Sequence, residues 1–257
     1  YIKHTRDLLN TVGLPLSMGY TTTIQNIGAM QNKGFELGVE AIPIAKEFEW
    51  RINFNASINR NKVLKLYNSQ DILGASIDVN LVQDYLNILR EGHPVGSFWG
   101  YLEDGYDEKG QIVFRDLNGD SRITLDDKTF IGDPNPNFIY GIQSVMNYKN
   151  FDFTFFIQGS QGNDIYNVSS INNTLDFGIG LNMPRDVYLN HWTPENRNAK
   201  YPIPKLSTNV RSSNRFVEDG SYLRLKNIEL AYNLRFNKNA IKSLRLFVNA
   251  QNLLTLT

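Results

Sequence analysis

The sequence predicts an all-β protein made of long antiparallel strands, and three features support this prediction. The 257 residues include 13 Tyr and 15 Phe, which favour strands, and 31 Asn, which favours turns over helix interiors. Several segments alternate strictly between apolar and polar residues, as half-buried strands do. Two very long stretches without such alternation separate these segments, and they predict long loops.

Residues 48–59 show the clearest alternation. Apolar side chains occupy the even positions, and polar side chains, among them Glu49, Arg51 and Asn53, occupy the odd ones. Because successive side chains of a strand point to opposite faces, this pattern predicts a strand with one apolar and one wet face. Runs of the same kind predict further strands over residues 35–41, 137–147, 151–158, 221–234 and 243–254.

The lengths of the connections favour one topology. The links over residues 43–47 and 148–150 are short, whereas the connections over residues 62–91 and 159–219 are long. An antiparallel transmembrane β-barrel has this asymmetry, with short periplasmic turns and long extracellular loops. The strands alone fit equally well a soluble sandwich whose apolar faces pack together. No run of 18 apolar residues occurs, so we expect no transmembrane helix.

Composition and motifs exclude several classes of function. A formal net charge of +0, from 26 basic and 26 acidic residues, gives no support for nucleic-acid binding. The chain contains no cysteine, which excludes disulfides and thiol nucleophiles. The three histidines are isolated in sequence, and no nucleophile elbow, P-loop or H-E-x-x-H motif occurs. We therefore expect a protein that is not an enzyme.

One segment has the spacing of calcium ligands. Asp116, Asn118, Asp120 and Asp127 place side-chain oxygens along a loop of about 12 residues, and Arg122 offers its backbone carbonyl at the seventh position. A serine replaces the glycine expected at the sixth position, and the last ligand is aspartate where glutamate is usual. The alternative is a polar hairpin turn without a metal, because an Asn-Gly pair is itself a strong turn signal.

Two tryptophans, Trp99 and Trp192, are candidates for contact with a substrate. An indole ring stacks on a sugar ring or on an apolar part of a peptide. The alternatives are packing in a core and a place in the aromatic belt of a membrane protein. Nothing in the sequence chooses between a glycan and a peptide.

Several strings occur in the same order as in one family of membrane proteins. The string Asn26–Leu37 resembles the N-x-G-x-x-x-N-x-G-x-E signature of a late barrel hairpin in SusC/RagA-type TonB-linked outer-membrane proteins. Further strings resemble the same family and together span nearly the whole chain. In chain order they are Gly92–Tyr101, Asp116–Asp127, Ile131–Pro136, Gln158–Gly159 with Gly162–Asn167, Trp192–Asn196, Asp219–Ile228 and Asn252–Thr255.

The resemblance implies an architecture in which residues 1–257 are part of a single TonB-dependent receptor barrel. They would form the C-terminal third of a 22-stranded barrel, and the N-terminal plug, the first part of the barrel and the last strands would lie outside this sequence. The resemblance also implies that the segment from Asp116 to Asp127 binds calcium.

The function implied by the resemblance is nutrient import at the bacterial outer membrane. The substrates would be glycan or peptide oligomers, and the partners would be a SusD-like surface lipoprotein that closes as a lid, the TonB complex and outer-membrane lipid. TonB would be reached through the absent N-terminal part. Two alternatives stay open: a soluble, calcium-stapled β-sandwich that binds carbohydrate, and a passive porin.

Overall fold

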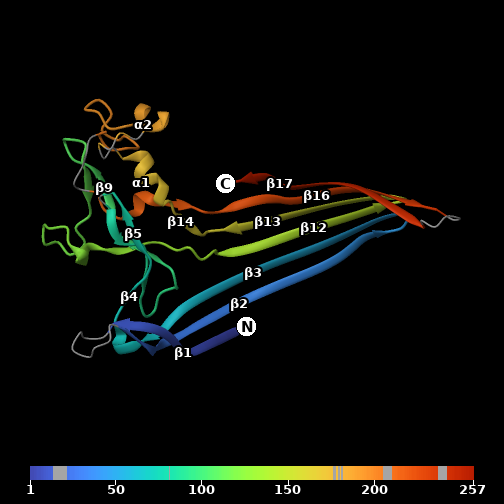
Figure 1. Cartoon of the computed structure of the whole chain (residues 1–257), viewed down its shortest axis with the longest axis horizontal. Coiled ribbons are helices and arrows are strands. Elements are labelled where there is room, and N and C mark those ends of the chain that lie inside the picture. The colour runs from blue at the N-terminus through green and yellow to red at the C-terminus, as the bar shows by residue number, and fades with distance from the viewer. Residues whose placement is uncertain are drawn as a thin grey trace.

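Seven long strands form one antiparallel sheet, which confirms the predicted all-β fold (Figure 1). The structure is a computed structural model and describes residues 1–13, 22–80, 82–175, 178, 180, 182–204, 210–236 and 242–257. Each long strand pairs with the next one along the chain, so the sheet is an up-and-down meander. In order, its members are β1 (Ile2–Gly13), β2 (Thr22–Ala45), β3 (Phe48–Leu66), β12 (Phe138–Tyr148), β13 (Phe151–Gln161), β16 (Tyr222–Arg235) and β17 (Ser243–Leu256).

The predicted strands are present, but some of their limits differ from the prediction. β2 continues to Ala45, so the link predicted over residues 43–47 is reduced to Lys46 and Glu47. A register shift that begins at Ala41 absorbs the extra residues. β1 and residues 22–34 of β2 were not predicted, because the sequence there does not alternate with period two.

The strand register aligns the apolar residues of the sheet on one face. Directly opposite residues of an antiparallel pair share a face. Phe54 of β3 lies opposite Val39 of β2 and Ile142 of β12, and Ile142 lies opposite Ile157 of β13. No other element of the described residues covers the side chains of this face. Phe35 of β2 is 63% exposed, and the apolar side chains of β17, at the far edge of the sheet, are exposed to a similar degree. We call it the apolar face.

The apolar face has the height of a membrane core. On β3 it runs from Phe48 to Ile58, which spans roughly 34 Å along a strand and about 25 Å along the normal of a barrel tilted by about 40°. Aromatic side chains gather at its end beside the short turns, as in the interfacial girdle of a membrane barrel. These are Phe48, Tyr148, Phe151 and Tyr232, which lie opposite one another on adjacent strands.

The long connections differ from the prediction in their limits and their content. β3 extends to Leu66 and the sheet resumes at Phe138, so the connection predicted over residues 62–91 covers residues 67–137 instead. Both long connections contain short elements of their own. The first holds η2 (Tyr67–Ser69), β4 (Ile72–Leu73), β5 (Ser76–Val79), β6 (Val82–Tyr85), β7 (Ile88–Leu89), β8 (Phe98–Gly100), β9 (Glu103–Tyr106), β10 (Ile112–Phe114), η3 (Leu125–Asp127) and β11 (Thr129–Gly132). The second holds β14 (Asp164–Tyr166), α1 (Val168–Thr174), α2 (Arg185–Leu189), η4 (Asn214–Phe216) and β15 (Val217–Asp219).

The two long connections pack into one unit at the end of the sheet away from the short turns (Figure 1). We call residues 67–137 and 162–221 the loop body. Its core draws on both connections, with Ile171 and Phe216 of the second completely buried. The first connection contributes Ile77, Val82, Tyr101, Ile112 and Phe114.

A buried ion pair also joins the two connections. The guanidinium of Arg215 lies 2.5 Å from the carboxylate of Glu103, and their side chains are 13% and 10% exposed. Ser213 Oγ donates to the same carboxylate at 2.7 Å, and Arg215 donates to the hydroxyl of Tyr106 at 3.0 Å. Burial raises the pKa of Tyr106 above its usual range.

The helices of the described residues are short. None of them is both long and apolar enough to cross a membrane.

The two faces of the sheet predict opposite environments for adjacent residues. We expect a spin label at Ile52 of the full-length protein in a bilayer to be relaxed by lipid-soluble oxygen, and one at Asn53 by a water-soluble nickel reagent. Electron paramagnetic resonance measures both accessibilities. The opposite pattern, or protection of both labels from both reagents, would contradict a membrane-facing apolar face.

Candidate functional site

The second face of the sheet is mostly polar, with Phe156 of β13 as an apolar member of its central row. Asn53 lies opposite Glu40 on one side and Gln143 on the other, and the same row continues through Asn227 to Gln251 at the far edge. Glu49 and Arg51, predicted to face a wet interior, lie on this face too, since they alternate with the apolar residues of β3. We call this the polar face.

Ion pairs fix the long side chains of the polar face. Arg51 contacts Glu49 at 3.0 Å and Glu40 at 3.8 Å. Arg245 contacts Glu229 at 2.5 Å and Asp152 at 3.8 Å. All these side chains are partly exposed, so the pairs add little to stability. Their consequence is a hydrated surface with charges of both signs in fixed places.

A recess interrupts the polar face where β12 carries a glycine. A Cβ atom on Gly141 would lie 3.0 Å from Asn55 Oδ1 and 3.1 Å from Phe156 Cε2, so neighbouring side chains already lean over the glycine. Gln158 donates a hydrogen bond to the hydroxyl of Tyr222 at 3.2 Å. The cavity has a volume of about 220 Å³. We call it the sheet recess, and its lining comprises Asn55, Ile139, Tyr140, Gly141, Phe156, Gln158, Gly159 and Tyr222.

The sheet recess combines amide groups with aromatic rings. Asn55 and Gln158 offer donors and acceptors, and Phe156 and Tyr222 offer ring surface. Such a set suits a polar oligomer with repeating hydrogen-bonding groups. Sequence reasoning missed this site, although a glycine inside a strand signals close approach of another group.

A network of hydrogen bonds anchors the loop body to the end of the sheet. The Asn135 amide donates to the Val95 carbonyl at 2.9 Å, and its oxygen accepts from Asn61 of β3 at 2.7 Å. The Asn61 side chain accepts from the Val95 backbone N–H at 2.6 Å. Asp133 donates through its backbone to the Asp164 carboxylate at 2.8 Å, which joins the second connection to the first. Val95, Asn135 and Asp164 belong to the strings that resemble the family. These strings therefore contain residues that hold the long connections in place.

The predicted calcium ligands lie together in a loop closed by its own hydrogen bonds. The two carboxylate oxygens of Asp116 each accept a backbone N–H at 2.7 Å, one from Gly119 and one from Ser121. The Asn118 side chain accepts from the Asp120 N–H at 2.9 Å. Asp120 in turn accepts from the backbone of Arg122 at 2.8 Å.

The serine at the sixth position takes the backbone conformation that a calcium loop needs there. Ser121 has a φ of 64°, in the left-handed region that favours glycine. The substitution therefore does not prevent the tight turn of the loop.

Asp127 closes the loop from its other end. Its side chain is fully buried and accepts the backbone N–H groups of Thr124 at 2.7 Å and Leu117 at 2.8 Å. The hydrogen bond from the Thr124 backbone is the largest cause that holds the Asp127 pKa below its usual range. The carboxylate is therefore ionised at neutral pH, as a metal ligand must be.

The donor chemistry of this loop fits calcium, although its acids do not converge. Within the part of the chain that the structure describes, no group of three or more His, Cys, Asp or Glu side chains is placed to hold a metal ion. A carboxylate has about four acceptor sites, so the two backbone hydrogen bonds that Asp116 accepts leave lone pairs for a cation, whereas Asp127 already accepts four hydrogen bonds. Calcium binding by the residues from Asp116 to Asp127 stays a prediction.

Both predicted tryptophans are packed inside the loop body. Trp99 is 9% exposed, lies edge-on to Phe130 at 5.1 Å, and has the Arg90 guanidinium 4.3 Å from its ring centre. Trp192 is 5% exposed and contacts Gly110, where a Cβ would lie 2.5 Å from the indole. Neither ring is open for stacking on a ligand in this structure, because each fills a gap between loop segments.

Proteins of known sequence resemble this chain over its whole length. TonB-dependent receptor P3 of Formosa agariphila is 36% identical over 277 residues, which cover 100% of this chain and 27% of the relative. TonB-dependent receptor SusC of Bacteroides thetaiotaomicron is 30% identical over 245 residues, which cover 91% of this chain and 24% of the relative. The chain thus spans about a quarter of the length of these relatives. No protein-family model matches it.

Solved structures give the same result. The RagAB peptide importer in its closed-closed state superimposes with a TM-score of 0.81 at 25% identity, over 100% of this chain and 29% of that one. Its open-open state gives a TM-score of 0.82 at the same identity. The shared fold, the whole-length identity and the ordered strings agree, and the chain belongs to the SusC/RagA-type TonB-dependent receptors, as part of their barrel.

Proposed function

We propose that the protein of which this chain is part imports glycan or peptide oligomers across the bacterial outer membrane, driven by TonB. The observation that carries the proposal is one sheet with an uncovered apolar face on one side and a mostly polar face on the other. The likeness to SusC and RagAB favours an energy-coupled importer over a passive porin. The uncovered apolar face argues against a soluble sandwich, which would bury it under a second sheet.

The sheet recess is the part of the polar face that we propose meets the substrate. Asn55 and Gln158 would hydrogen-bond the backbone or hydroxyl groups of an oligomer, and Phe156 would pack on its rings or side chains. Import by this route needs no bond chemistry in the barrel. A moderate number of exchangeable contacts suits a path along which the substrate must both bind and leave.

The first functional prediction concerns uptake. We expect N55A together with Q158A in the full-length protein to lower uptake of the cognate oligomer severalfold, because two hydrogen-bonding side chains are lost. Uptake of fluorescently labelled peptide and oligosaccharide by whole cells measures the effect and identifies the substrate class. N147A, also on the polar face but beside the short turns, is the matched control. Equal uptake by all three proteins would remove the sheet recess from the path.

We propose that the loop body contacts a SusD-like surface lipoprotein. Its helix α2 buries Val187 but leaves Tyr188 73% exposed and Leu189 59% exposed. Neighbouring apolar side chains that remain exposed at the tip of an otherwise packed unit are typical of a protein interface. The helix is fixed underneath, since the Asp186 carboxylate accepts from the Lys200 ammonium at 2.9 Å and from the Tyr201 hydroxyl at 2.7 Å.

The second functional prediction concerns this partnership. We expect Y188S together with L189S to reduce copurification of the lipoprotein from outer membranes, because the exposed apolar contact is removed while the loop body keeps its core. Quantitative mass spectrometry of the purified complex gives the ratio of the two proteins. L73S, which replaces an exposed apolar side chain on β4, is the control. An unchanged ratio in the double variant would exclude α2 from the interface.

We propose further that the loop from Asp116 to Asp127 binds calcium. Asp116, Asn118, Asp120 and Asp127 would supply side-chain oxygens, and Arg122 its carbonyl. A bound divalent cation would supply only cross-linking of the loop, so its role is structural. The proposal is supported by the ligand spacing and by the left-handed backbone at the sixth position.

Titration calorimetry of the full-length protein with calcium chloride tests this proposal. We expect binding to the native protein and its loss in D116A and in D120A, each of which removes a charged ligand. D107A, which removes a carboxylate from a different turn, should bind as the native protein does. The absence of heat from the native protein after removal of bound metal would leave a polar hairpin turn in place of a calcium site.

A further inference from the structure

Positive charge gathers on β1, β2 and β3 immediately beyond the apolar face. The last apolar row of that face consists of Phe35 and Ile58, which lie opposite each other. The next row pairs Lys33 with Arg60, and the one after it pairs Gln31 with Lys62. Because residues two apart on a strand share a face, these cations continue the apolar face toward the loop body.

A bulge keeps the next cation on the same face. Met30 pairs with Val63 and Ala29 pairs with Lys65, so Leu64 is the extra residue of β3. Lys65 therefore shares the face of Ala29, and hence that of Lys33. The extra residue, Leu64, is itself 41% exposed, and it shifts the phase of β3 so that Lys65 also lies on this face.

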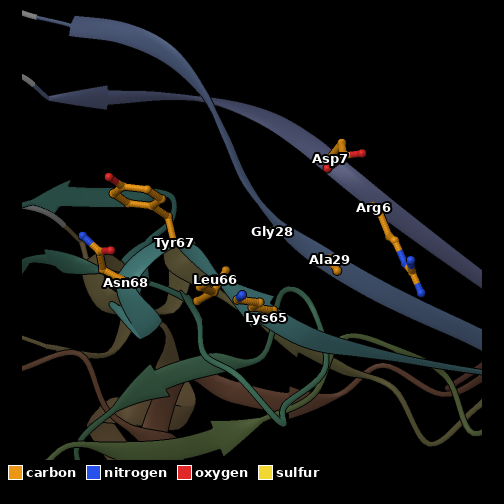
Figure 2. Close-up of a pocket in the computed structure, with 8 residues that line it drawn as sticks. All are labelled: Arg6, Asp7, Gly28, Ala29, Lys65, Leu66, Tyr67 and Asn68. Atoms are coloured by element: carbon orange, nitrogen blue, oxygen red, sulfur yellow. The ribbon is translucent and has the colours of Figure 1, made fainter.

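β1 brings a further cation to the same place. A cavity of about 570 Å³ lies between β1, β2 and the end of β3. Figure 2 shows the side chains of Arg6 and Lys65 on the two sides of the small residue Ala29. The lining of the cavity is Arg6, Asp7, Gly28, Ala29, Lys65, Leu66, Tyr67 and Asn68. We call Arg6, Lys33, Lys62 and Lys65 the basic patch.

The side chains of this patch form no ion pairs within the described part of the chain. All four of its side chains are exposed, and none forms an ion pair with a described carboxylate. The nearest acids on the packed elements are Asp7, which lines the cavity, and Glu91, which accepts the backbone N–H of Leu66 at 2.8 Å.

Arg60 lies in the same rows but is already engaged. Its guanidinium donates to the backbone carbonyls of Asn59, Pro136 and Asn137 and to the side chain of Asn137. The four cations of the basic patch are therefore the ones available to a ligand.

We propose that the basic patch binds the phosphorylated head group of an anionic lipid in the outer leaflet of the membrane. The patch begins where the apolar face ends and extends roughly 5 to 15 Å beyond it along the membrane normal, which is the level of lipid head groups. Lysine is a compact, mobile charge that suits phosphate, and four exposed cations complement a polyanionic head group. The inference rests on the membrane location proposed above.

Lipid retention by the full-length protein tests the inference without any need for transport. The protein, purified in neutral detergent, is incubated with mixed micelles that contain either diphosphorylated lipid A or phosphatidylcholine, and native mass spectrometry counts the bound lipids. The test variant is K33Q, K62Q and K65Q combined. The control variant is K46Q, K149Q and K242Q, which removes equal charge near the short turns.

We expect the native protein and the control variant to retain lipid A equally, and the test variant to retain it at least tenfold less, because a cation near an anionic surface contributes about fivefold to binding. Phosphatidylcholine should bind all three proteins alike. Mobility of the unheated protein on a denaturing gel confirms that each barrel is folded.

Equal retention by all three folded proteins would overturn the inference, and so would an equal loss in the control variant, which would indicate only a net charge effect. Loss of the lipoprotein partner with lipid retention unchanged would assign the patch to a protein interface and also overturn it. A failure of oligomer uptake in the native protein would refute the proposed import function but would leave the lipid measurement intact.

Discussion

The constraint on which the rest of the structure depends is the unbroken backbone pairing of the long strands. A segment that faces lipid must satisfy every backbone N–H and C=O within the protein, because lipid offers no partners. All 11 residues of β12 pair in register with β13, and its other edge pairs with β3. A slip of one residue would exchange the apolar and polar faces, so side-chain pattern and backbone register support each other.

Bulges preserve the two faces where the sequence changes phase. In β16 the apolar residues occupy even positions from Ile228 onward but odd positions at Leu223 and Leu225. A register shift toward β13 leaves Lys226 as the extra residue of β16, so both sets point to the same side. β17 shifts at the same level, where Asn252 takes a positive φ of 53°. The interruption in period two is thus compensated by the backbone.

The sequence predicted the membrane-height part of the sheet well and its extensions poorly, for a physical reason. Between Phe48 and Ile58 one side of β3 is apolar and the other polar, and this contrast appears as alternation in the sequence. Residues 28–34 of β2 lie beyond the apolar face, and neither they nor β1 alternate with period two in sequence. The resemblance to the family rests on ordered strings. Several of these strings contain residues, such as Asn135, whose hydrogen bonds hold the loops to the sheet.

The loop body was hardest to predict, because its core forms only when residues of both long connections pack together. Tyr166 and Phe216 pack against residues about a hundred positions earlier, and the Tyr166 hydroxyl contacts Ser212 Oγ at 2.9 Å in the interior. Burial raises the pKa of Tyr166 to about 12, so the hydroxyl stays neutral in this core. The sequence could not decide between ligand contact and core packing for Trp99 and Trp192, because nothing local reveals such distant packing partners.

The charged side chains are also distributed unequally between the two faces of the sheet. The formal net charge of +0 gives no hint of a basic surface, yet the cations of the basic patch lie on the outer side beyond the apolar face, while Glu36, Glu40 and Glu49 lie on the polar face. Lys33 and Glu36 are three residues apart in sequence but point to opposite sides of the same strand. A strand therefore separates charges that composition averages away. The strand register decides which residues lie together on each side of this sheet. The amino-acid composition alone does not determine the chemistry of either side.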